Sequence, residues 1–424
     1  MTKSLAAALM LLVTLQLSSS NVREEFANLN QQARSARQSG DKEAYLRAAL
    51  QMQELLHHAP SAVKTTARAY AAAGDTKHAL AALNQLAELG QTDETLLNGK
   101  DPGFSTLSDL PEYKSILEHF ARNNAAISLG KPAFTLHDPG ILAEDITYDS
   151  QSKSFLITSV LEKKIIRVTS DGAATDFAQS PGHWPMLAIK ADSARNVVWA
   201  TEVALDGFTI VPKPDWGRSA VLCFNLKTGA LLSRIEGPPH SALGDMVLTS
   251  TGEPIVSDGA EGGVYKVIGD HLKLLNSHDF ISPQTPAMLP DGDHALVPDY
   301  LRGIGILDLR DEHVTWLNMD QEAKNALSGI DGLYLDRGSL ILTQNGTSPE
   351  RVTRLQLDKT YTRIISSQII EQATPTLGDP THGVIVGDSF YYIANSGWDK
   401  LDEHGNATPG SRLSPSLIMR FQLP

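Results

Sequence analysis

Apolar and polar positions alternate in short runs over most of the chain, from residue 141 to its end. Within residues 141–168 there are three such runs, at 146–148, 155–158 and 165–168, separated by two polar turns. Alternation with a period of two residues, bounded by turn residues, is typical of β-strands with one buried face. The segment therefore predicts three antiparallel strands in series.

The same arrangement recurs five more times along the chain. The later copies lie at residues 186–200, 244–267, 286–309, 329–357 and 382–396, and the last is completed by a run at 417–422. Recurrence at roughly 40–50 residues matches the length of a four-stranded propeller blade. Closing the blades into a ring removes the exposed sheet edges of an open repeat. The sequence therefore predicts an all-β six-bladed propeller over residues 127–424, with residues 205–219 as an inserted loop.

Residues 21–126 have a different pattern, in which Ala, Leu, Gln and Glu dominate. Gly40-Asp41 and Gly74-Asp75 interrupt helical runs at the 34-residue spacing of tetratricopeptide units. The stretch that includes Ala67, Tyr70 and Ala79 resembles such a unit, with these side chains at the motif's positions. The resemblance implies a short helical solenoid, and repeats of this kind bind a peptide or partner protein in their concave face. A domain used only for packing is the alternative.

The first 20 residues predict a secretory signal peptide. Lys3 is followed by an apolar run at residues 5–17 and then by three serines. A charged start, a short apolar run and small residues at the end are the parts of a cleavable signal. We expect cleavage near residue 20, with an uncleaved anchor as the alternative. The expected product is a multidomain protein of the bacterial periplasm or exterior, with a helical solenoid at 21–126 and a propeller at 127–424.

Composition narrows the possible partners and the compartment. The 424 residues carry a formal net charge of −13, which argues against nucleic acid and against anionic membrane surfaces. The lone cysteine, Cys223, cannot form an internal disulfide, so stability must come from packing. We expect no membrane association after the signal is removed.

Candidate site residues follow from the geometry of a propeller. The innermost strand of each blade begins at one rim of the central channel, and the second strand returns to that rim. Residues just before the first strands form an inner set: Glu144, Asp145, Met186, Asp245, Gln284, Asp331 and His382. Residues just after the second strands form an outer set: Ser159, Glu202, Asp258, Asp299, Asn345 and Asn395.

Carboxylates that face one another without Lys or Arg between them persist when a hard cation lies among them. Oxygen ligands of this kind suit calcium best, with magnesium or manganese next. We therefore predict a cation near Asp245 and Asp331, with His382 as the best-placed proton carrier and a nearby aspartate such as Asp331 assisting it. Turn capping by the two aspartates, a hydrogen-bonded wall histidine and a structural Glu144 are the alternatives.

The propeller half resembles the gluconolactonase and senescence-marker-protein family, and residues 143–160 (AEDITYDSQSKSFLITSV) also resemble the first blade of the paraoxonases. The resemblance implies a metal-dependent lactonase or esterase in which Glu144 is a metal ligand. The paraoxonase pattern adds Asp145, and the family's later-blade aspartate is matched by Asp331 or Asp245. The chain departs from the family at the middle blades, where residues 243–245 and 284–286 lack the usual Asn.

Two functions remain open from the sequence. The first is an exported metal-dependent hydrolase of a lactone or ester. The second is a non-catalytic binding protein, in which the helical repeats dock a partner and the propeller mouth holds a ligand. Trp184, Trp216 and Trp398 lie near the expected mouth loops, where they would stack on an organic ligand or pack the loops.

Overall fold

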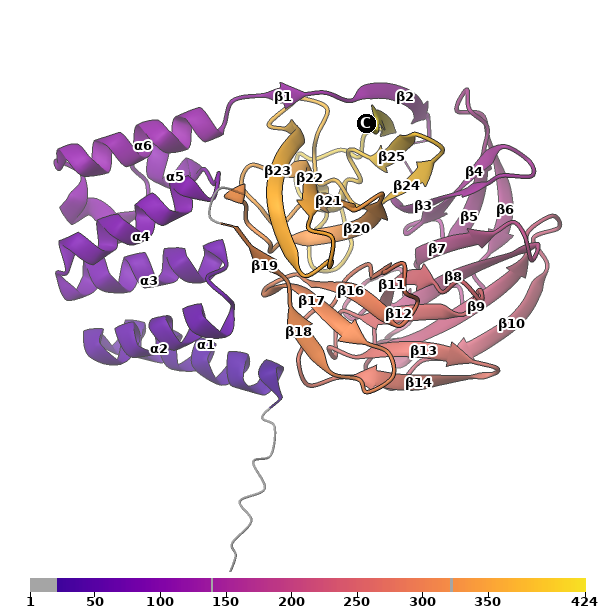
Figure 1. Cartoon of the computed structure of the whole chain (residues 1–424), viewed down its shortest axis with the longest axis horizontal. Coiled ribbons are helices and arrows are strands. Elements are labelled where there is room, and N and C mark those ends of the chain that lie inside the picture. The colour runs from indigo at the N-terminus through magenta and orange to yellow at the C-terminus, as the bar shows by residue number, and fades with distance from the viewer. Residues whose placement is uncertain (1–20, 139, 321–322) are drawn as a thin grey trace, which may run out of the picture.

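The computed structural model describes residues 21–138, 140–320 and 323–424, so the expected signal peptide lies outside the described residues. The chain folds into an N-terminal helical region beside a ring of six antiparallel sheets (Figure 1). The helices are α1 (Val22–Ser39), α2 (Lys42–Leu55), α3 (Pro60–Ala73), α4 (Thr76–Glu88), α5 (Glu94–Leu97), the 3-10 turn η1 (Pro102–Leu107) and α6 (Pro111–Asn123).

Local capping explains where these helices begin and end. The side chains of Asn21, Asp41 and Asp75 accept hydrogen bonds from main-chain N–H groups in the first turns of α1, α2 and α4. Gly40 and Gly74 end α1 and α3 in the left-handed conformation that glycine adopts readily. Helices α1 to α4 pack in sequence order as antiparallel neighbours. Their tetratricopeptide character stays a prediction.

Each blade is a meander whose first strand lies innermost. Blade 1 comprises β3 (Ala143–Asp149), β4 (Ser154–Ser159), β5 (Lys164–Val168) and β6 (Ala174–Gln179). Blade 2 comprises β7 (Met186–Asp192), β8 (Val197–Ala204), β9 (Arg218–Asn225) and β10 (Leu231–Glu236). Blade 3 comprises β11 (Leu243–Leu248), β12 (Pro254–Asp258), β13 (Val264–Ile268) and β14 (His271–Asn276).

The remaining blades complete the ring. Blade 4 comprises β15 (Ala287–Met288), β16 (His294–Asp299), β17 (Gly303–Asp308) and β18 (Val314–Trp316). Blade 5 comprises β20 (Ile330–Asp336), β21 (Ser339–Gln344), β22 (Arg351–Leu357) and β23 (Arg363–Gln372), extended by β1 (Ile127–Ser128) and β19 (Asn318–Met319). Blade 6 comprises β24 (Gly383–Val386), β25 (Ser389–Ile393), β26 (Ser416–Gln422) and β2 (Lys131–Leu136).

The ring is closed by pairing strands from its two ends. β2, which precedes blade 1 in the sequence, pairs antiparallel with β26 as the outer strand of blade 6. The predicted fold class, a helical region followed by a six-bladed propeller, is confirmed.

Bulges and hydroxyl groups fix the rim at which the inner strands begin. The first strands of blades 1, 2, 3 and 5 each shift register near their start. In blade 1, Thr158 Oγ1 accepts a hydrogen bond from the N–H of Asp145 (3.0 Å) and donates to the carbonyl of Leu187 in blade 2 (2.5 Å). Thr343 bridges blades 5 and 6 in the same way, from the N–H of Gly332 to the carbonyl of Thr381. Bulges change the direction of side chains next to functional sites. Here the hydroxyls of Thr158 and Thr343 hold the bulged strands against the next blade.

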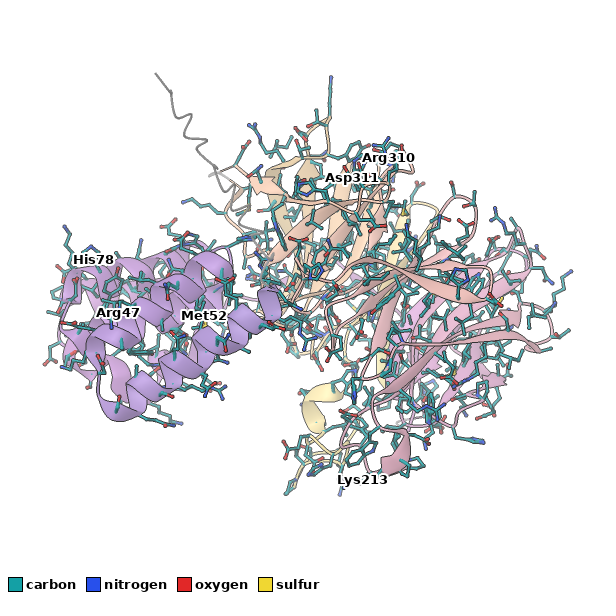
Figure 2. All side chains as sticks on the ribbon, turned by 90° about the horizontal axis from the view of Figure 1, so that it is seen from below. Arg47, Met52, His78, Lys213, Arg310 and Asp311 are labelled. Carbon is teal, nitrogen blue, oxygen red and sulfur yellow. The ribbon has the colours of Figure 1, made fainter. Side chains whose placement is uncertain are left out.

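The helical region packs against this same rim. Arg302 Nε, in the turn after the second strand of blade 4, donates to the carbonyl of Leu55 at the end of α2 (2.9 Å). The N–H of Thr92 donates to the carbonyl of Ser348 in the corresponding turn of blade 5 (2.6 Å). Figure 2 shows Lys213 on a loop of this rim, while Arg310 and Asp311 lie at the opposite end of the propeller. No described helix is long and apolar enough to cross a membrane.

Candidate metal centre at the propeller rim

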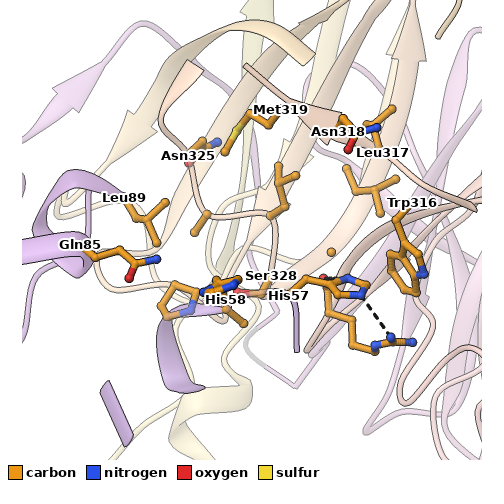
Figure 3. Close-up of a pocket in the computed structure, with 17 residues that line it drawn as sticks. His57, His58, Gln85, Leu89, Trp316, Leu317, Asn318, Met319, Asn325 and Ser328 are labelled. Carbon is orange, nitrogen blue, oxygen red and sulfur yellow. Dashed lines mark hydrogen bonds between the residues drawn. The ribbon is translucent and has the colours of Figure 1, made fainter. Parts of the chain in front are cut away.

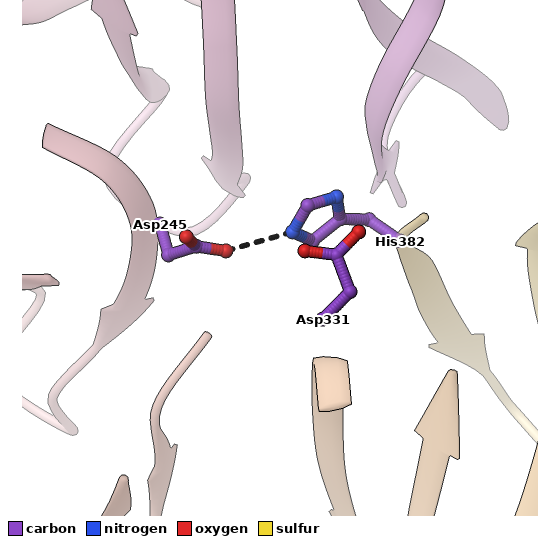
Figure 4. A group of neighbouring side chains, drawn as sticks. All are labelled: Asp245, Asp331 and His382. Atoms are coloured by element: carbon purple, nitrogen blue, oxygen red, sulfur yellow. Dashed lines mark hydrogen bonds and ion pairs between the residues drawn. The ribbon is translucent and has the colours of Figure 1, made fainter. Parts of the chain in front are cut away.

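Three ionisable side chains from three blades converge at the rim. Asp245 stands at the start of β11, Asp331 at the start of β20 and His382 just before β24, and one ligand atom of each lies within 4.8 Å of the others. Their exposed fractions are 5%, 9% and 1%. Figure 4 shows the three side chains pointing toward one another from separate blades. The structure therefore brings three of the predicted site residues together at one rim.

The imidazole of His382 is fixed on both sides. Its Nδ1 lies 2.8 Å from the carbonyl oxygen of Glu144, which can only accept, so Nδ1 carries a proton. Its Nε2 lies 2.7 Å from Asp245 Oδ1, and Thr285 Oγ1 donates to that oxygen at 2.5 Å. A proton must lie between Nε2 and Asp245, because two lone pairs would repel at this distance. His382 and Asp245 therefore form a proton-sharing pair.

The electrostatic environment resists the removal of that proton and the full ionisation of the acids. Burial alone would lower the pKa of His382, but Asp331, Asp145 and Asp245 raise it well above its ordinary value. Burial raises the pKa of Asp331 to about 7; His382 opposes this rise, while Asp245 adds to it. Such a group of buried acids holds protons or a cation at neutral pH.

Glu144 joins the cluster from blade 1. Burial raises the pKa of its carboxyl to about 8; His382 opposes the rise, while Asp331 adds to it. The indole Nε1 of Trp398, in the turn η4 (Trp398–Lys400), donates to Glu144 Oε2 at 2.5 Å. The hydroxyl of Thr381 donates to the Glu144 main-chain carbonyl (2.8 Å), which also receives the His382 proton. Glu144 thus connects Trp398, through its carboxyl group, to the imidazole of His382, through its main-chain carbonyl.

The side-chain amide of Asn345 fixes the carboxylate of Asp331. Asn345 Nδ2 donates to Asp331 Oδ2 at 2.9 Å, and Tyr300 donates its hydroxyl proton to Asn345 Oδ1 at 3.0 Å. The amide orientation is thereby set from both ends, and one oxygen of Asp331 is fixed in space. Asn345 belongs to the outer set of rim residues and contacts the cluster through its hydrogen bond to Asp331.

Asp145 faces blade 2 instead of the cluster. Its carboxylate accepts hydrogen bonds from the N–H groups of Ile146 and Ile189, both at 2.8 Å, and from Lys190 Nζ at 2.5 Å. These contacts tie two adjacent blades together. We therefore replace the expected role of Asp145 as a metal ligand with a structural one.

Most of the outer set also serves the fold. Asp258 and Asp299 accept several main-chain N–H groups of neighbouring turns, and Glu202 pairs with Arg234 at 2.7 Å. Asn395 accepts the N–H of Leu417 at 2.6 Å. Equivalent positions in the blades thus hold the rim turns, while the inner set supplies the cluster.

Two loops meet over blades 1, 2 and 6. The N–H of Thr209, in the blade 2 insertion, donates to the carbonyl of His404 in the blade 6 loop at 3.0 Å. Phe208 and Trp398 rings are 5.9 Å apart in a buried apolar cluster. The insertion expected at residues 205–219 thus packs on the loop that carries Trp398.

A cavity lies in the central channel, beside the cluster. It has a volume of about 290 Å³ and is lined by inner-strand residues that include Lys190, Thr285 and Tyr334. The Tyr334 hydroxyl accepts the N–H of Gly383 at 2.7 Å, and burial raises its pKa well above the ordinary value. Thr285 and Tyr334 were not foreseen, although Thr285 directly follows Gln284, the predicted inner position of blade 4.

No family model and no curated protein matches the chain. Among solved structures it is similar to a gluconolactonase from Xanthomonas campestris (14% identity, 68% of this chain and 89% of the other, TM-score 0.47). It is also similar to a luciferin-regenerating enzyme (13%, 70% and 94%, TM-score 0.48). A third similarity is to regucalcin, a calcium-binding protein of Agrobacterium tumefaciens (17%, 70% and 98%, TM-score 0.46). Identities this low say nothing about the chemistry of this chain.

Proposed function

We propose that the propeller is a metal-dependent hydrolase that acts on a small lactone or ester at this rim. The observation that carries the proposal is the convergence of Asp245, Asp331 and His382 from three blades within 4.8 Å, with Glu144 of a fourth blade hydrogen-bonded to His382 through its main-chain carbonyl. Buried acids that raise one another's pKa values need a cation or protons to remain together. The cluster also lies next to the channel cavity, since Thr285, which lines that cavity, donates to Asp245.

The side chains present fit a divalent cation held by carboxylate oxygens. Glu144, Asp245 and Asp331 are the proposed ligands, and oxygen-only coordination favours calcium, with magnesium or manganese next. A ligand set that included His382 Nε2 would instead favour zinc. When bound, such a cation polarises a carbonyl and stabilises the oxyanion formed from it.

The protein's own groups handle the proton. The pair formed by His382 Nε2 and Asp245 Oδ1 already shares a proton and is placed to donate it to the leaving alcohol oxygen, while the Asp331 carboxylate is placed to take a proton from the attacking water. The hydrogen bond from Nδ1 to the carbonyl of Glu144 keeps the ring from turning during that transfer. Asn345 and Trp398 hold the oxygens of Asp331 and Glu144, so the acids need little reorganisation.

The experiment compares Asp331→Asn with Asp336→Asn, two changes at opposite ends of the same strand, β20. The purified chain without its signal is assayed with δ-lactones and phenyl acetate, in chelator and after calcium is restored. We expect calcium-dependent hydrolysis that Asp331→Asn reduces by about 100-fold or more, with Asp336→Asn close to the parent. Hydrolysis at the same rate in chelator and in the Asp331→Asn variant would overturn the proposal.

A non-catalytic binding role is the second candidate. It is favoured by the helical region, which contacts the turns of blades 4 and 5 on the rim that carries the cluster. A peptide or protein partner held by the helices would then lie next to the mouth. Absence of hydrolysis on every lactone and ester, together with retained cation binding, would favour this role. Export to the periplasm belongs to both proposals and is tested by the N-terminus of the mature protein.

A further inference from the structure

A cleft lies between blades 6 and 1, at the end of the propeller opposite the cluster. Its volume is about 510 Å³, within the range of small-molecule sites. The second strand of each blade runs toward the cluster rim, so the start of β25 and the turn after β5 lie at the other end. Strands β2, β25 and β26 form one side of the cleft, and Phe155 and Ser170 of blade 1 form the other. The cleft therefore lies where β2 closes the ring.

Two cations stand directly opposite each other in this cleft. Lys131 of β2 is the register partner of Arg420 of β26, whose partner on the other side is Tyr391 of β25. Directly opposite side chains share one face of a sheet, and like charges in such a pair are destabilising. No described lining residue is acidic, although the whole chain carries a net charge of −13. An anion between the two cations would remove their repulsion.

The guanidinium of Arg420 keeps N–H groups free. Its Nε donates to Ser389 Oγ (2.9 Å) and its Nη2 to Gln422 Oε1 (3.2 Å). Nη1 and the second N–H of Nη2 therefore have no acceptor among the described residues, and these two atoms form a fork that fits a carboxylate. The groove between the helices and blades 4 and 5 (Figure 3) differs in this respect, because the guanidinium of Arg302 already donates there to two main-chain carbonyls.

Three more donors of the cleft have no acceptor among the described residues. They are the ammonium of Lys131 and the hydroxyls of Tyr391 and Ser170. Lys131, Ser170 and Arg420 are exposed and Tyr391 is half-buried, so a ligand in the cleft can reach these side chains. The polar edge of the cleft thus offers donors and positive charge.

The floor of the cleft is aromatic. The Phe134 and Phe155 ring centres are 5.1 Å apart, and the Tyr391 ring lies 5.0 Å from that of Phe155. The central carbon of the Arg420 guanidinium is 5.9 Å from the centre of the Tyr391 ring. Leu129 extends the apolar surface toward solvent. An occupant therefore meets aromatic carbon below and cationic donors at its edge.

We propose that this cleft binds a small aromatic carboxylate. The carboxylate would accept from the free fork of Arg420 and from Lys131 Nζ, and the ring would lie against Tyr391 and Phe155. Inorganic phosphate would satisfy the cations but would leave the aromatic floor to water. Because β2 and β26 close the ring and Phe155 belongs to blade 1, the ligand would also stabilise the closure. The inference does not depend on hydrolysis at the rim, which lies at the other end of the propeller.

The probes are 2-naphthoate, its neutral counterpart 2-naphthalenemethanol, and inorganic phosphate. The full chain without its signal is titrated in chelator, so that no cation at the rim can bind the carboxylate. We expect saturable 2-naphthoate binding by calorimetry, about tenfold or more tighter than that of the alcohol or of phosphate at equal ionic strength. The melting temperature should rise with 2-naphthoate. No saturable binding of 2-naphthoate, or binding equal to that of the alcohol or of phosphate, would overturn the proposal.

Lys131→Glu tests the pair of cations, because it places a carboxylate directly opposite Arg420. The cross-strand pair becomes attractive, so the ligand-free variant should melt above the parent, while its affinity for 2-naphthoate should fall about tenfold or more. Lys131 is exposed, so the change leaves the core intact. Lys227→Glu is the control: it makes the same change of charge in the exposed turn after β9, at the same end of the propeller, and should stay close to the parent. Equal 2-naphthoate affinity in the two variants would contradict the site.

Discussion

His382 Nε2 lies 2.7 Å from Asp245 Oδ1, although the two residues are 137 positions apart and belong to blades 6 and 3, which face each other across the ring. The contact can form only when the ring of blades is closed, so its loss should affect both the cluster and the stability of the ring. His382→Gln would leave Asp245 and Asp331 facing each other without an imidazolium. Breaking one partner of a buried pair costs about 3–5 kcal/mol.

We therefore expect His382→Gln to lose stability of that order in urea unfolding with chelator present, and part of it to return with calcium. His294→Gln is the control, because His294 pairs with Asp291 and Asp308 at the surface, where such pairs contribute about 1 kcal/mol or less. Equal losses in the two variants would show that the cluster is not electrostatically coupled.

Trp398→Phe tests the contact between the mouth loop and Glu144. Its indole N–H is a charge-assisted donor to Glu144 Oε2 when the carboxylate binds calcium, so its loss should weaken calcium binding by about 10–100-fold, the equivalent of one such hydrogen bond. Trp199→Phe is matched, since Trp199 Nε1 is buried without a partner among the described residues. It should leave calcium affinity unchanged, as measured by titration calorimetry; a loss in both variants would point to general loosening.

Stability should depend on pH through Glu350, a mouth carboxyl outside the proposed ligand set. Burial raises its pKa to about 7, with the N–H of Asp379 acting against the rise. The unfolded value is about 4.3, so the folded state binds the extra proton between these values. The free energy of unfolding must therefore fall as pH rises from about 4.3 to 7.

Glu350→Gln should flatten that fall in denaturant titrations at pH 5 and pH 8. Glu253→Gln is the control: the hydrogen bond from Lys266 lowers the pKa of Glu253, so its stabilisation is lost only below the unfolded pKa, and the difference between pH 5 and pH 8 should not change. An unchanged difference between pH 5 and pH 8 in Glu350→Gln would contradict the assignment.

Gln372 holds the contact, here called the seam, between the end of α6 and blade 5. Its Nε2 donates to the carbonyls of Asn123 (3.1 Å) and Ala125 (3.0 Å), just after α6. Gln372→Leu should cost about 1–3 kcal/mol, because it removes two hydrogen bonds to partly buried carbonyls, and should speed hydrogen exchange in α6. Gln368→Leu, at an exposed position of the same strand, should do neither. Equal exchange in both variants would show that the seam is held elsewhere.

The repeat could be predicted from the sequence because strand alternation and spacing are local properties. Ring closure places the residue before every first strand at one rim, so Asp245, Asp331 and His382 were found without knowledge of any contact. The last blade was harder to complete, since its outer strand β2 comes from the other end of the ring.

Side-chain direction within a bulge could not be predicted. Glu144 and Asp145 are adjacent, yet one joins the cluster while the other turns to Lys190, because the register shift between Ala143 and Ile146 reorients this part of the strand. The contacts of Thr285 with Asp245 and of Trp398 with Glu144 could not be predicted either, because each joins side chains of two neighbouring blades. The seam between the helices and the rim likewise involves contacts more than 200 positions apart, such as Arg302 with Leu55.

Metal analysis of the purified chain tests the central claim most directly. The parent, Asp331→Asn and Asp336→Asn proteins would be dialysed together against equal calcium, magnesium, manganese and zinc and then analysed by mass spectrometry. The account predicts one equivalent of a divalent cation, calcium before the others, in the parent and Asp336→Asn, and none in Asp331→Asn. A parent that emerges without metal, or an Asp331→Asn protein that retains the same equivalent, would contradict it.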